Sequence, residues 1–526
     1  MAAKPGIHAI AGFDDDSGIA PASTRRSSMS LVNAKPVVYT IAGSDSSGGA
    51  GIQADLLTLH SLGVHACTLI TALTTQNQQG VRMLEPREPA QLCHEFLTMK
   101  STMPPVAIKI GMLANATLVR TVAALLQDHP VPTVCDPVLG ASAGGALLDA
   151  AGRQQLRLLL PLITLLTPNA QEAALLTGMP VRNLAEMETA AEALRALGAP
   201  AVLVTGGDLD LDGGCCYDYF ASATGCFWLQ GPRIATPHTH GTGCTLSSAI
   251  AAFLAHGQAL EDAVVLARMA VTQGLRDARG VGTVTGAVAH PGWPRGLENL
   301  PRLWPGRAEM PQKLRFAPCA PLGLYPVVDS VAWVEKLLAE GVHTIQLRIK
   351  HQASEPLRAS IRQAVALQRR HGAQLFINDH WQLAIECGAY GVHLGQEDLA
   401  QADLAAIAAA GLRLGTSNHS WSELARSHAL APSYLALGPI FPTTTKVMRF
   451  APQGLTQLCE WVALLDPHYR LTAIGGIDTR NAAQVLVTGV PSIAVVRAIT
   501  EARDHRQAVR LLTAALAEAM IEKGNA

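Results

Sequence analysis

The 526-residue sequence has few aromatic and few charged residues, 4% and 15%, and its formal net charge is only −1. No lysine or arginine run is dense enough to indicate nucleic acid or an anionic membrane as a partner. The longest apolar stretch, residues 156–166, is interrupted by Arg157 and Pro161 and is far shorter than the ~20 residues of a membrane span. We therefore expect small-molecule partners.

Cysteine motifs are also missing. The ten cysteines include no CxxC pair and no cysteine–histidine cluster at zinc spacing, which predicts ordinary buried thiols. The N-terminus has no apolar segment of the kind found in a signal peptide. A reducing cytoplasmic location is the expectation, and the sequence leaves a homo-oligomer open.

Hydrophobic residues, by contrast, make up 49% of the chain, enough for sizeable cores. Since domains hold roughly 100–250 residues, two large ones are the economical interpretation. Residues 1–34 predict a flexible tail. Residues 35–285 alternate β-type and helical runs, which predicts a mostly parallel sheet covered by helices. Residues 286–321 carry seven prolines without clear periodicity and are interpreted as a linker.

Residues 322–526 contain eight candidate strands separated by helical patterns, as a (β/α)8 barrel requires. The predicted strands are 323–328, 343–349, 374–378, 391–394, 413–416, 434–438, 472–476 and 492–496.

Polar residues gather at the ends of these strands, where barrel enzymes place their chemistry. The two-residue period of a strand puts Gln346, Arg348 and Lys350 on one face. Asp379 and Asp398 follow adjacent strands and could share a hard cation such as Mg²⁺. Singly, each residue has a structural explanation as a helix cap or turn, but their joint placement predicts a binding site.

Five segments together resemble the thiamine phosphate synthase family: residues 346–350, 378–379, 395–398, 438–446 and 473–477. The resemblance covers about residues 320–520. It implies an Mg²⁺-dependent condensation of a pyrimidine diphosphate with a thiazole phosphate, with release of pyrophosphate. Position 497 departs from the family, which commonly has serine there. The implied contacts are Gln346, Arg348, Lys350, Asn378, Ser417 and Lys446 on the pyrimidine diphosphate, Asp379 and Asp398 on Mg²⁺, and Thr443, Thr444, Thr445, Gly476, Val496 and Arg497 on the thiazole phosphate.

The first half has no GxxxxGK[ST] phosphate loop, so a Walker-type nucleotide site is not expected. The stronger signal is HGTGCT at residues 240–245, directly before an apolar helix at 246–254. Small residues at a helix start leave free N–H groups, and the helix dipole adds positive potential, which favours a phosphate. Cys244 should then have a lowered pKa and could act as a base. The alternative is a capped helix with a buried thiol.

Residues 42–55, 71–77 and 167–172 join this motif in resembling hydroxymethylpyrimidine and phosphomethylpyrimidine kinases of the ribokinase-like fold. The resemblance spans about residues 36–280 and implies two successive ATP-dependent phosphorylations. A common family variant has lysine where this chain has Thr205. The implied residues are Gln76 and Asp55 on the pyrimidine ring, Asn169, Glu172, Asp136, Gly241, Thr242 and Gly243 on ATP and phosphate, and Cys244 in catalysis.

The predicted fold is therefore α/β throughout, a ribokinase-like parallel-sheet domain followed by a TIM barrel. The product implied for the first half is the substrate implied for the second, which favours a bifunctional enzyme of thiamine biosynthesis. Two alternatives stay open. The first domain could act on pyridoxal-type vitamers, or one half could be a non-catalytic ligand-binding regulatory module.

Overall fold

The computed structural model describes residues 34–77, 80–140, 145–211, 214–306, 314–350, 353–443 and 451–525. The predicted tail, apart from Ala34, therefore lies outside the described residues. Within the described ranges, no helix is long and apolar enough to cross a membrane.

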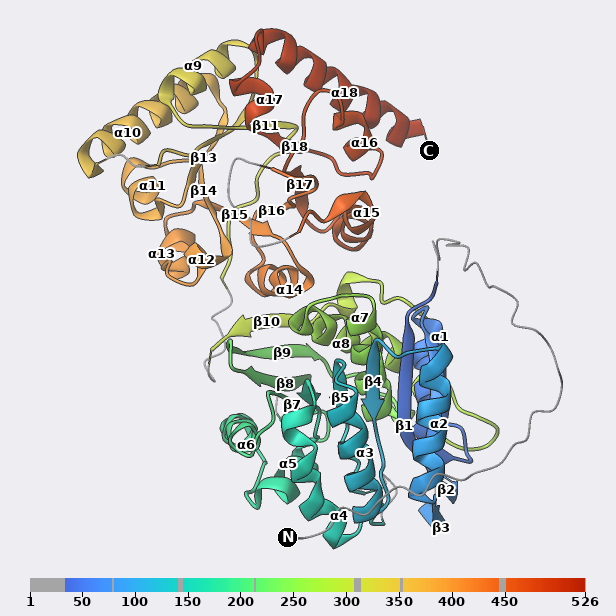
Figure 1. Ribbon diagram of the computed structural model, residues 1–526. Coiled ribbons are helices and arrows are strands. Elements are labelled where there is room, and N and C mark those ends of the chain that lie inside the picture. Colours follow the sequence, from blue (N-terminus) through green and yellow to red (C-terminus); the bar gives the residue numbers. More distant parts are fainter. Residues whose placement is uncertain are drawn as a thin grey trace, which may run out of the picture. The chain divides into compact units, whose positions relative to one another are not determined.

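The first half is built on a ten-stranded sheet, coloured blue to green in Figure 1, in the order β10-β9-β8-β7-β6-β5-β4-β1-β2-β3. The inner strands pair in parallel, and the strands at both edges pair antiparallel. The prediction of a mostly parallel sheet is confirmed. The parallel strands are β1 (Val37–Asp45), β2 (His65–Asn77), β4 (Ala107–Ile110), β5 (Thr133–Cys135), β6 (Leu165–Leu166) and β7 (Ala201–Thr205), and the antiparallel strands are β3 (Gly80–Pro86), β8 (Cys215–Ser222), β9 (Cys226–Pro232) and β10 (Arg302–Pro305).

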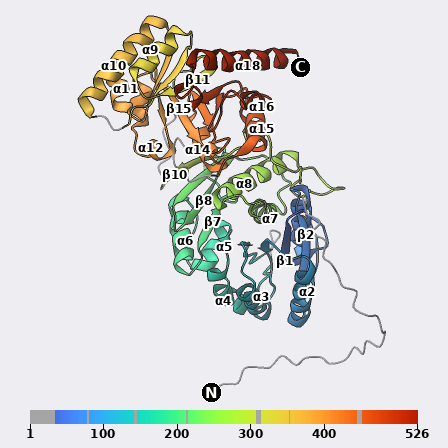
Figure 2. The ribbon, with the colours of Figure 1, turned by 45° about the horizontal axis from the view of Figure 1, so that its top comes forward.

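Helices cover both faces of this sheet and can be followed in Figure 2. Alternate residues of β1 face opposite ways, because side chains of a strand alternate. Val38 packs with the apolar helices α7 and α8, whereas Tyr39 packs with residues of α2 and α3. The helices are α1 (Gly51–Ser61), α2 (Pro89–Thr102), α3 (Ala116–Asp128), α4 (Ala150–Gln155), α5 (Ala170–Thr177), α6 (Leu184–Ala196), α7 (Thr242–Ala255) and α8 (Leu260–Asp277), with short 3-10 turns at Leu156–Leu158, Leu160–Leu162 and Leu297–Asn299.

The predicted linker at 286–321 begins too early. Strand β10 comes from inside it and pairs antiparallel with β9, placing Leu303 beside Leu229 and Trp304 beside Trp228. Ala287 also forms a parallel β-bridge with His240, the first residue of the HGTGCT motif. Proline is tolerated on an edge strand, where no further ladder bond is needed, so the proline content did not exclude a strand here.

The second half is a closed parallel barrel in the strand order β11 to β18, coloured yellow to red in Figure 1. All eight predicted strands are present, and the TIM barrel is confirmed. The strands are β11 (Leu324–Val328), β12 (Thr344–Leu347), β13 (Gln374–Asn378), β14 (Gly391–Leu394), β15 (Arg413–Asn418), β16 (Tyr434–Leu437), β17 (Arg470–Ile474) and β18 (Ile493–Val495).

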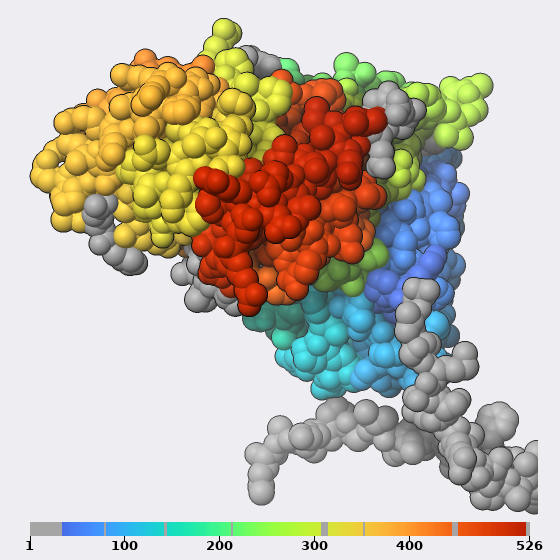
Figure 3. Space-filling model, turned by 90° about the horizontal axis from the view of Figure 1, so that it is seen from above, coloured from blue at the N-terminus to red at the C-terminus, as the bar shows by residue number. Residues whose placement is uncertain are grey.

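Ten helices in the described residues surround this barrel, and the last, α18, lies at the surface, red in Figure 3. They are α9 (Val331–Ala339), α10 (Ser354–His371), α11 (Trp381–Cys387), α12 (Gln396–Leu399), α13 (Leu404–Ala409), α14 (Trp421–Leu430), α15 (Gly454–Leu465), α16 (Ala482–Leu486), α17 (Arg497–Thr500) and α18 (His505–Asn525).

An aromatic cluster fills the inside of the barrel. Tyr325, Phe376 and Tyr434 are buried together with Cys319, which belongs to the segment just before the first strand. That segment is fixed by its backbone, since Ser433 Oγ donates to the carbonyl of Ala317 at 2.6 Å. This aromatic cluster lies next to the polar residues at the carboxyl ends of the strands and forms the floor at that end of the barrel.

Candidate active sites

The structure brings two distant motifs of the first half together. Gly241, the N-cap directly before α7, has a left-handed φ of 81°, and a Cβ there would lie 2.1 Å from the carbonyl oxygen of Gly49. Only glycine permits that approach. Next to it, His240 Nε2 lies 3.1 Å from Asp45 Oδ2. The start of α7 is thus placed against the glycine-rich loop after β1.

Asp45 is the residue of this loop that sequence reasoning missed. Its carboxylate accepts hydrogen bonds from the backbone N–H groups of Gly49 at 3.1 Å and Ala50 at 2.8 Å. Burial favours its neutral form, but hydrogen bonds from His240 and Ser47 outweigh this and hold the Asp45 pKa well below its usual range. A signal was available, since an aspartate followed by serines and glycines favours a side-chain-closed turn.

Gln76, predicted to read the pyrimidine ring, lies near the same carboxylate. It is the last residue but one of β2 and is half-buried, and its side chain contributes to the low pKa of Asp45. Its backbone is fixed by Ser46, whose Oγ donates to the Gln76 carbonyl at 3.2 Å.

The position of Asp55 does not suit a residue that contacts the pyrimidine ring of a substrate. It is completely buried, and both of its oxygens lie 2.8 Å from Lys109 Nζ. Thr40 and Ser248 donate their hydroxyls to the same carboxylate. Each oxygen therefore already accepts two hydrogen bonds, and Asp55 anchors a buried ion pair. Lys109 was missed, although a lysine inside the apolar run at 106–111 was a visible signal.

Two carboxyls predicted for the phosphate region, Asp136 and Glu172, are close enough to repel each other. Burial raises the pKa of Asp136 to about 6, and Lys109 opposes this shift. Burial raises the pKa of Glu172 to about 7, and the charge of Asp136 adds to the shift. Gly243 at the start of α7 adjoins this pair, because a Cβ there would lie 3.4 Å from Asp136 Oδ2.

Asn169 and Glu172 form a capping box at the start of α5. Asn169 Oδ1 accepts from the backbone N–H of Glu172 at 2.8 Å, and Glu172 Oε2 accepts from that of Asn169 at 3.1 Å. Glu172 Oε1 also accepts from the N–H of Leu139 at 3.1 Å. These side chains thus have a structural task besides any contact with nucleotide.

The expected low pKa of Cys244 is wrong. Burial raises the pKa of this thiol to about 12, Lys109 opposes the shift, and the charges of Asp55 and Asp136 add to it. Cys244 does lie in the first turn of α7, but burial governs its pKa there. Thr242, also in the motif, donates its hydroxyl to the carbonyl of Thr239 at 2.5 Å.

A cavity of about 710 Å³ opens at the carboxyl ends of the barrel strands. Lys350 is exposed and does not line it, and Thr444, Thr445 and Lys446 lie outside the described residues. The predicted residues that do line it are Gln346, Arg348, Asn378, Asp379, Asp398, Ser417, Thr443, Gly476, Val496 and Arg497.

Asp379 and Asp398 meet in this cavity. Burial and the adjacent charge of Asp398 raise the pKa of Asp379, while Arg348 opposes the shift. Asp379 has a left-handed φ of 63°, an uncommon conformation for a residue with a side chain. In the described residues, no group of three or more histidine, cysteine or acidic side chains gathers to hold a metal.

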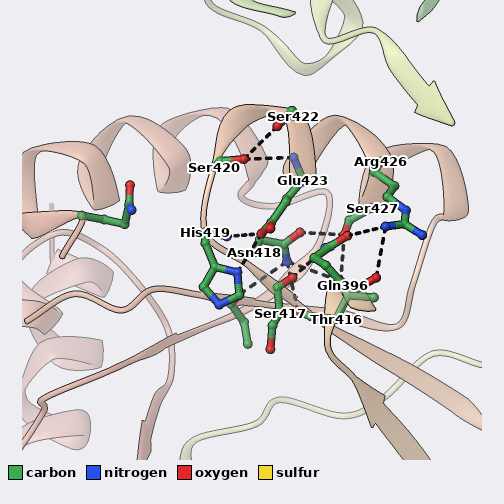
Figure 4. A network of polar contacts seen from close by, with 12 residues as sticks. Gln396, Thr416, Ser417, Asn418, His419, Ser420, Ser422, Glu423, Arg426 and Ser427 are labelled. Carbon is green, nitrogen blue, oxygen red and sulfur yellow. Dashed lines mark hydrogen bonds and ion pairs between the residues drawn. The ribbon is translucent and has the colours of Figure 1, made fainter. Parts of the chain in front are cut away.

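A polar network fixes Ser417 at the end of β15 (Figure 4). Gln396 Nε2 donates to the Ser417 carbonyl at 2.7 Å, and Arg426 Nη1 donates to the Gln396 carbonyl at 3.1 Å. His419 and Glu423 pair at 2.7 Å beside it. Since Gln396, His419 and Glu423 also line the cavity, sequence reasoning missed part of its wall.

Comparison with known proteins follows the same division of the chain. Residues 45–289 match the family model of phosphomethylpyrimidine kinase, and residues 324–499 match that of thiamine monophosphate synthase. The thiamine-phosphate synthase of Pectobacterium atrosepticum is 60% identical over 198 residues, which cover 38% of this chain and 93% of that protein. The chain belongs to the thiamine-phosphate synthase family.

The synthase of Photorhabdus laumondii is similar too, with 56% identity over 200 residues, 37% of this chain and 92% of that protein. In this synthase fusion the first half resembles solved kinases. The phosphomethylpyrimidine kinase of Clostridium difficile is 34% identical, with 45% of this chain and 99% of that chain covered and a TM-score of 0.41. A pyridoxal kinase of Staphylococcus aureus in complex with AMP-PCP and pyridoxal is 28% identical, with 52% and 100% covered and a TM-score of 0.47.

These findings confirm a phosphomethylpyrimidine kinase domain fused to a thiamine-phosphate synthase domain, and hence a bifunctional transferase of thiamine biosynthesis. ATP as co-substrate has support from the kinase family. The matched model is that of the pyrimidine kinase, so neither alternative, a pyridoxal-type kinase or a non-catalytic half, is favoured.

Proposed function

We propose that the first half phosphorylates 4-amino-5-hydroxymethyl-2-methylpyrimidine twice with ATP, and that the second half joins the resulting diphosphate to thiazole phosphate. The observation that carries the proposal is the barrel cavity, which combines an amide, a cation and two adjacent carboxylates at the strand ends. These groups suit an aminopyrimidine, a diphosphate and a hard cation respectively.

In the barrel, we assign Mg²⁺ to Asp379 and Asp398. The raised pKa of Asp379 supports the assignment, because two carboxyls held this close ionise together readily only when a cation joins them. Bound Mg²⁺ would take up negative charge on the departing pyrophosphate. Arg348 would add a second positive charge at the cavity wall, and preorganised charge of this kind is often the largest catalytic term.

The thiazole phosphate is assigned to the loops after β16, β17 and β18. Thr443, Gly476, Val496 and Arg497 all line the cavity there. Backbone N–H groups at the ends of the seventh and eighth strands are the usual phosphate site of this fold. Arg497 could then add a charge-assisted hydrogen bond where the family commonly has serine.

In the kinase half, we assign the transferred phosphate to the N–H groups at the start of α7, and Gln76 to the pyrimidine ring. Asp136 and Glu172 would serve Mg²⁺ and the nucleotide phosphates. Cys244 would receive the hydroxyl proton of the substrate. Because its pKa of about 12 leaves the thiol protonated at neutral pH, it must first lose its own proton, and the kinase rate should therefore rise with pH.

A coupled assay tests the proposal. The full chain is supplied with ATP, Mg²⁺, the hydroxymethylpyrimidine and thiazole phosphate, and thiamine phosphate is expected. Its absence with a folded protein would refute the function. Cys244→Ala should abolish only the kinase reaction, with Cys244→Asp restoring part of it, and Asp379→Ala should abolish only the synthase reaction. To test the alternative kinase substrate, pyridoxal and the pyrimidine alcohol are supplied together, and the compound that is phosphorylated preferentially is identified.

We further propose that the chain works in the cytoplasm. All ten cysteines are free, as suits a reducing compartment.

A further inference from the structure

A row of hydrogen-bonded side chains runs along the floor of the barrel cavity, and four of its five members, Gln346, Tyr325, His393 and Ser417, line that cavity. Gln346 Nε2 donates to Tyr325 Oη at 3.2 Å, and Tyr325 Oη lies 2.6 Å from Tyr434 Oη. Tyr434 Oη lies 2.7 Å from His393 Nδ1, and His393 Nε2 lies 2.9 Å from Ser417 Oγ. The five groups come from β11, β12, β14, β15 and β16.

Every interior member of this row is uncharged. Tyr325 and Tyr434 are buried, and burial raises the pKa of both phenols. His393 is also buried, and its two ring nitrogens face the hydroxyls of Tyr434 and Ser417 and not a carboxylate, which favours the neutral imidazole. At neutral pH each phenol therefore has one proton to donate, and the imidazole carries its proton on one nitrogen only.

With the Gln346 amide oriented as it is here, and with each buried hydroxyl donating one bond, proton counting gives every bond a direction. Tyr325 accepts from the Gln346 amide, so its own proton goes to Tyr434. The proton of Tyr434 must go to His393 Nδ1, which leaves the imidazole proton on Nε2, facing Ser417. Ser417 Oγ accepts that bond, and its own hydrogen is free for a ligand. At the other end, Gln346 donates one N–H to Tyr325 and can offer its carbonyl oxygen to a ligand.

We propose that Tyr325, Tyr434 and His393 are positioning residues. Through this row of hydrogen bonds, called the relay below, they couple whether Gln346 presents a donor or an acceptor to the cavity with whether Ser417 does. This inference rests on the proposed synthase function. In the arrangement seen here, the cavity presents an acceptor at Gln346 and a donor at Ser417. A ligand with the opposite pattern can bind well only if the Gln346 amide turns over and all four following bonds reverse together.

The relay thereby selects an aminopyrimidine against its oxo counterpart. A 4-amino group donates and the ring nitrogen accepts, which matches the arrangement seen. In the 4-oxo analogue the exocyclic oxygen accepts and the neighbouring ring nitrogen carries a hydrogen, so the pattern is inverted. With two cavity bonds unmade, the oxo compound should bind about 100-fold more weakly. The relay would thus exclude a deaminated pyrimidine of nearly the same shape.

Tyr434→Phe tests the relay in the full chain. The variant removes the link between Tyr325 and His393, so Ser417 can change its sense without reversing the Gln346 amide. We measure KM for 4-amino-5-hydroxymethyl-2-methylpyrimidine diphosphate and the inhibition constant of its 4-oxo analogue in the synthase reaction. The preference for the amino compound should fall about tenfold. The control is Tyr390→Phe, which removes a hydroxyl bonded to Gln374 at 2.9 Å beside the same aromatic cluster; its preference should stay unchanged.

Two further measurements separate positioning from a merely structural role. In a Ser417→Ala background the last hydroxyl of the relay is missing. Tyr434→Phe should then change the remaining preference for the amino compound over its 4-oxo analogue less than twofold. Nitrogen-15 spectra of histidine-labelled full chain, with His393→Gln to identify the signals, should show the proton of His393 on Nε2.

An unchanged preference in Tyr434→Phe, an undiminished effect in the Ser417→Ala background, or a proton on Nδ1 would each overturn the relay. A wild-type chain that makes no thiamine phosphate would instead refute the proposed function, and the nitrogen-15 spectra would still decide the relay.

Discussion

Lys109 and Asp55 form an ion pair in which neither side chain reaches solvent. Lys109→Met removes the positive charge at similar length and leaves the Asp55 carboxylate buried without compensation. The free energy of unfolding of the kinase half should fall by about 3–5 kcal/mol. Urea unfolding of the full chain, followed by kinase activity and by fluorescence, measures the loss.

The matched control is the double variant Lys109→Met with Asp55→Leu, which replaces the whole pair by apolar groups. It should recover most of the lost stability. A loss below about 1 kcal/mol in the single variant would contradict a buried charged pair.

For single residues, the sequence predicts which residue lies at a site better than it predicts the pKa or the contacts of that residue. The position of Cys244 at the start of a helix could be predicted, because glycines precede it and an apolar run follows. Its pKa could not, since that depends first on burial in the folded chain and then on charges such as Asp55 and Asp136, which are about 190 and 110 positions away in the chain. The task of Asp55 was likewise hidden until its partner Lys109 was placed beside it.

Among the elements, helix α5 begins with a cap that belongs to the proposed nucleotide site. Asn169→Ala should cost about 1 kcal/mol of stability and also raise the KM for ATP. Asn183 caps α6 through the same kind of bond, from the N–H of Glu186 at 2.9 Å, and makes a matched control. Asn183→Ala should cost similar stability without changing the KM for ATP. If both variants changed the KM for ATP equally, the assignment of Asn169 to the nucleotide site would be wrong.

The loop after β17 supplies a second test. Gly476 has a left-handed φ of 66°, and a Cβ there would lie 2.7 Å from the carbonyl oxygen of Pro442. Gly476→Ala should push these two loops apart and raise the KM for thiazole phosphate at least tenfold. Gly489→Ala meets the same backbone strain, at a φ of 87°, but its Cβ comes no nearer than 3.6 Å to another residue. It should leave that KM unchanged, and a similar rise in both would point to strain alone.

Element prediction worked where one pattern repeats. The eight barrel strands are short apolar runs between helical patterns, so each supports the assignment of the others. The antiparallel edge strands β3, β8, β9 and β10 were missed because they interrupt the alternation expected for a parallel sheet. The hairpin of β8 and β9 did carry a signal, since aromatic residues 217, 219 and 220 precede the turn glycine at 225.

For the whole molecule, the raised carboxyl pKa values predict how pH and Mg²⁺ act together. The folded kinase half holds protons on Asp136 and Glu172, up to about pH 6 and 7, more tightly than an unfolded chain does. Without metal, stability should therefore fall as pH rises from about 4 to about 7. Mg²⁺ binds the ionised forms, so its affinity should rise over the same window.

Thermal unfolding with Mg²⁺ and with EDTA, measured from about pH 5 to about pH 7.5, checks both statements. The gain in Tm from Mg²⁺ should grow with pH, and EDTA should stop both partial reactions until Mg²⁺ is restored. A gain that shrinks as pH rises would contradict the assignment of these carboxyls to the metal.

Strand β10 also decides where the chain can be divided. A truncated protein ending at residue 285 would lack the edge strand and leave β9 with an open row of backbone groups beside Leu229 and Trp228. Open, apolar edges pair with other chains, so this fragment should aggregate. A fragment ending at residue 306 keeps β10 and should run as a compact species in size-exclusion chromatography. The proline-rich segment thus supplies the edge strand of the kinase sheet before it connects the kinase domain to the synthase domain.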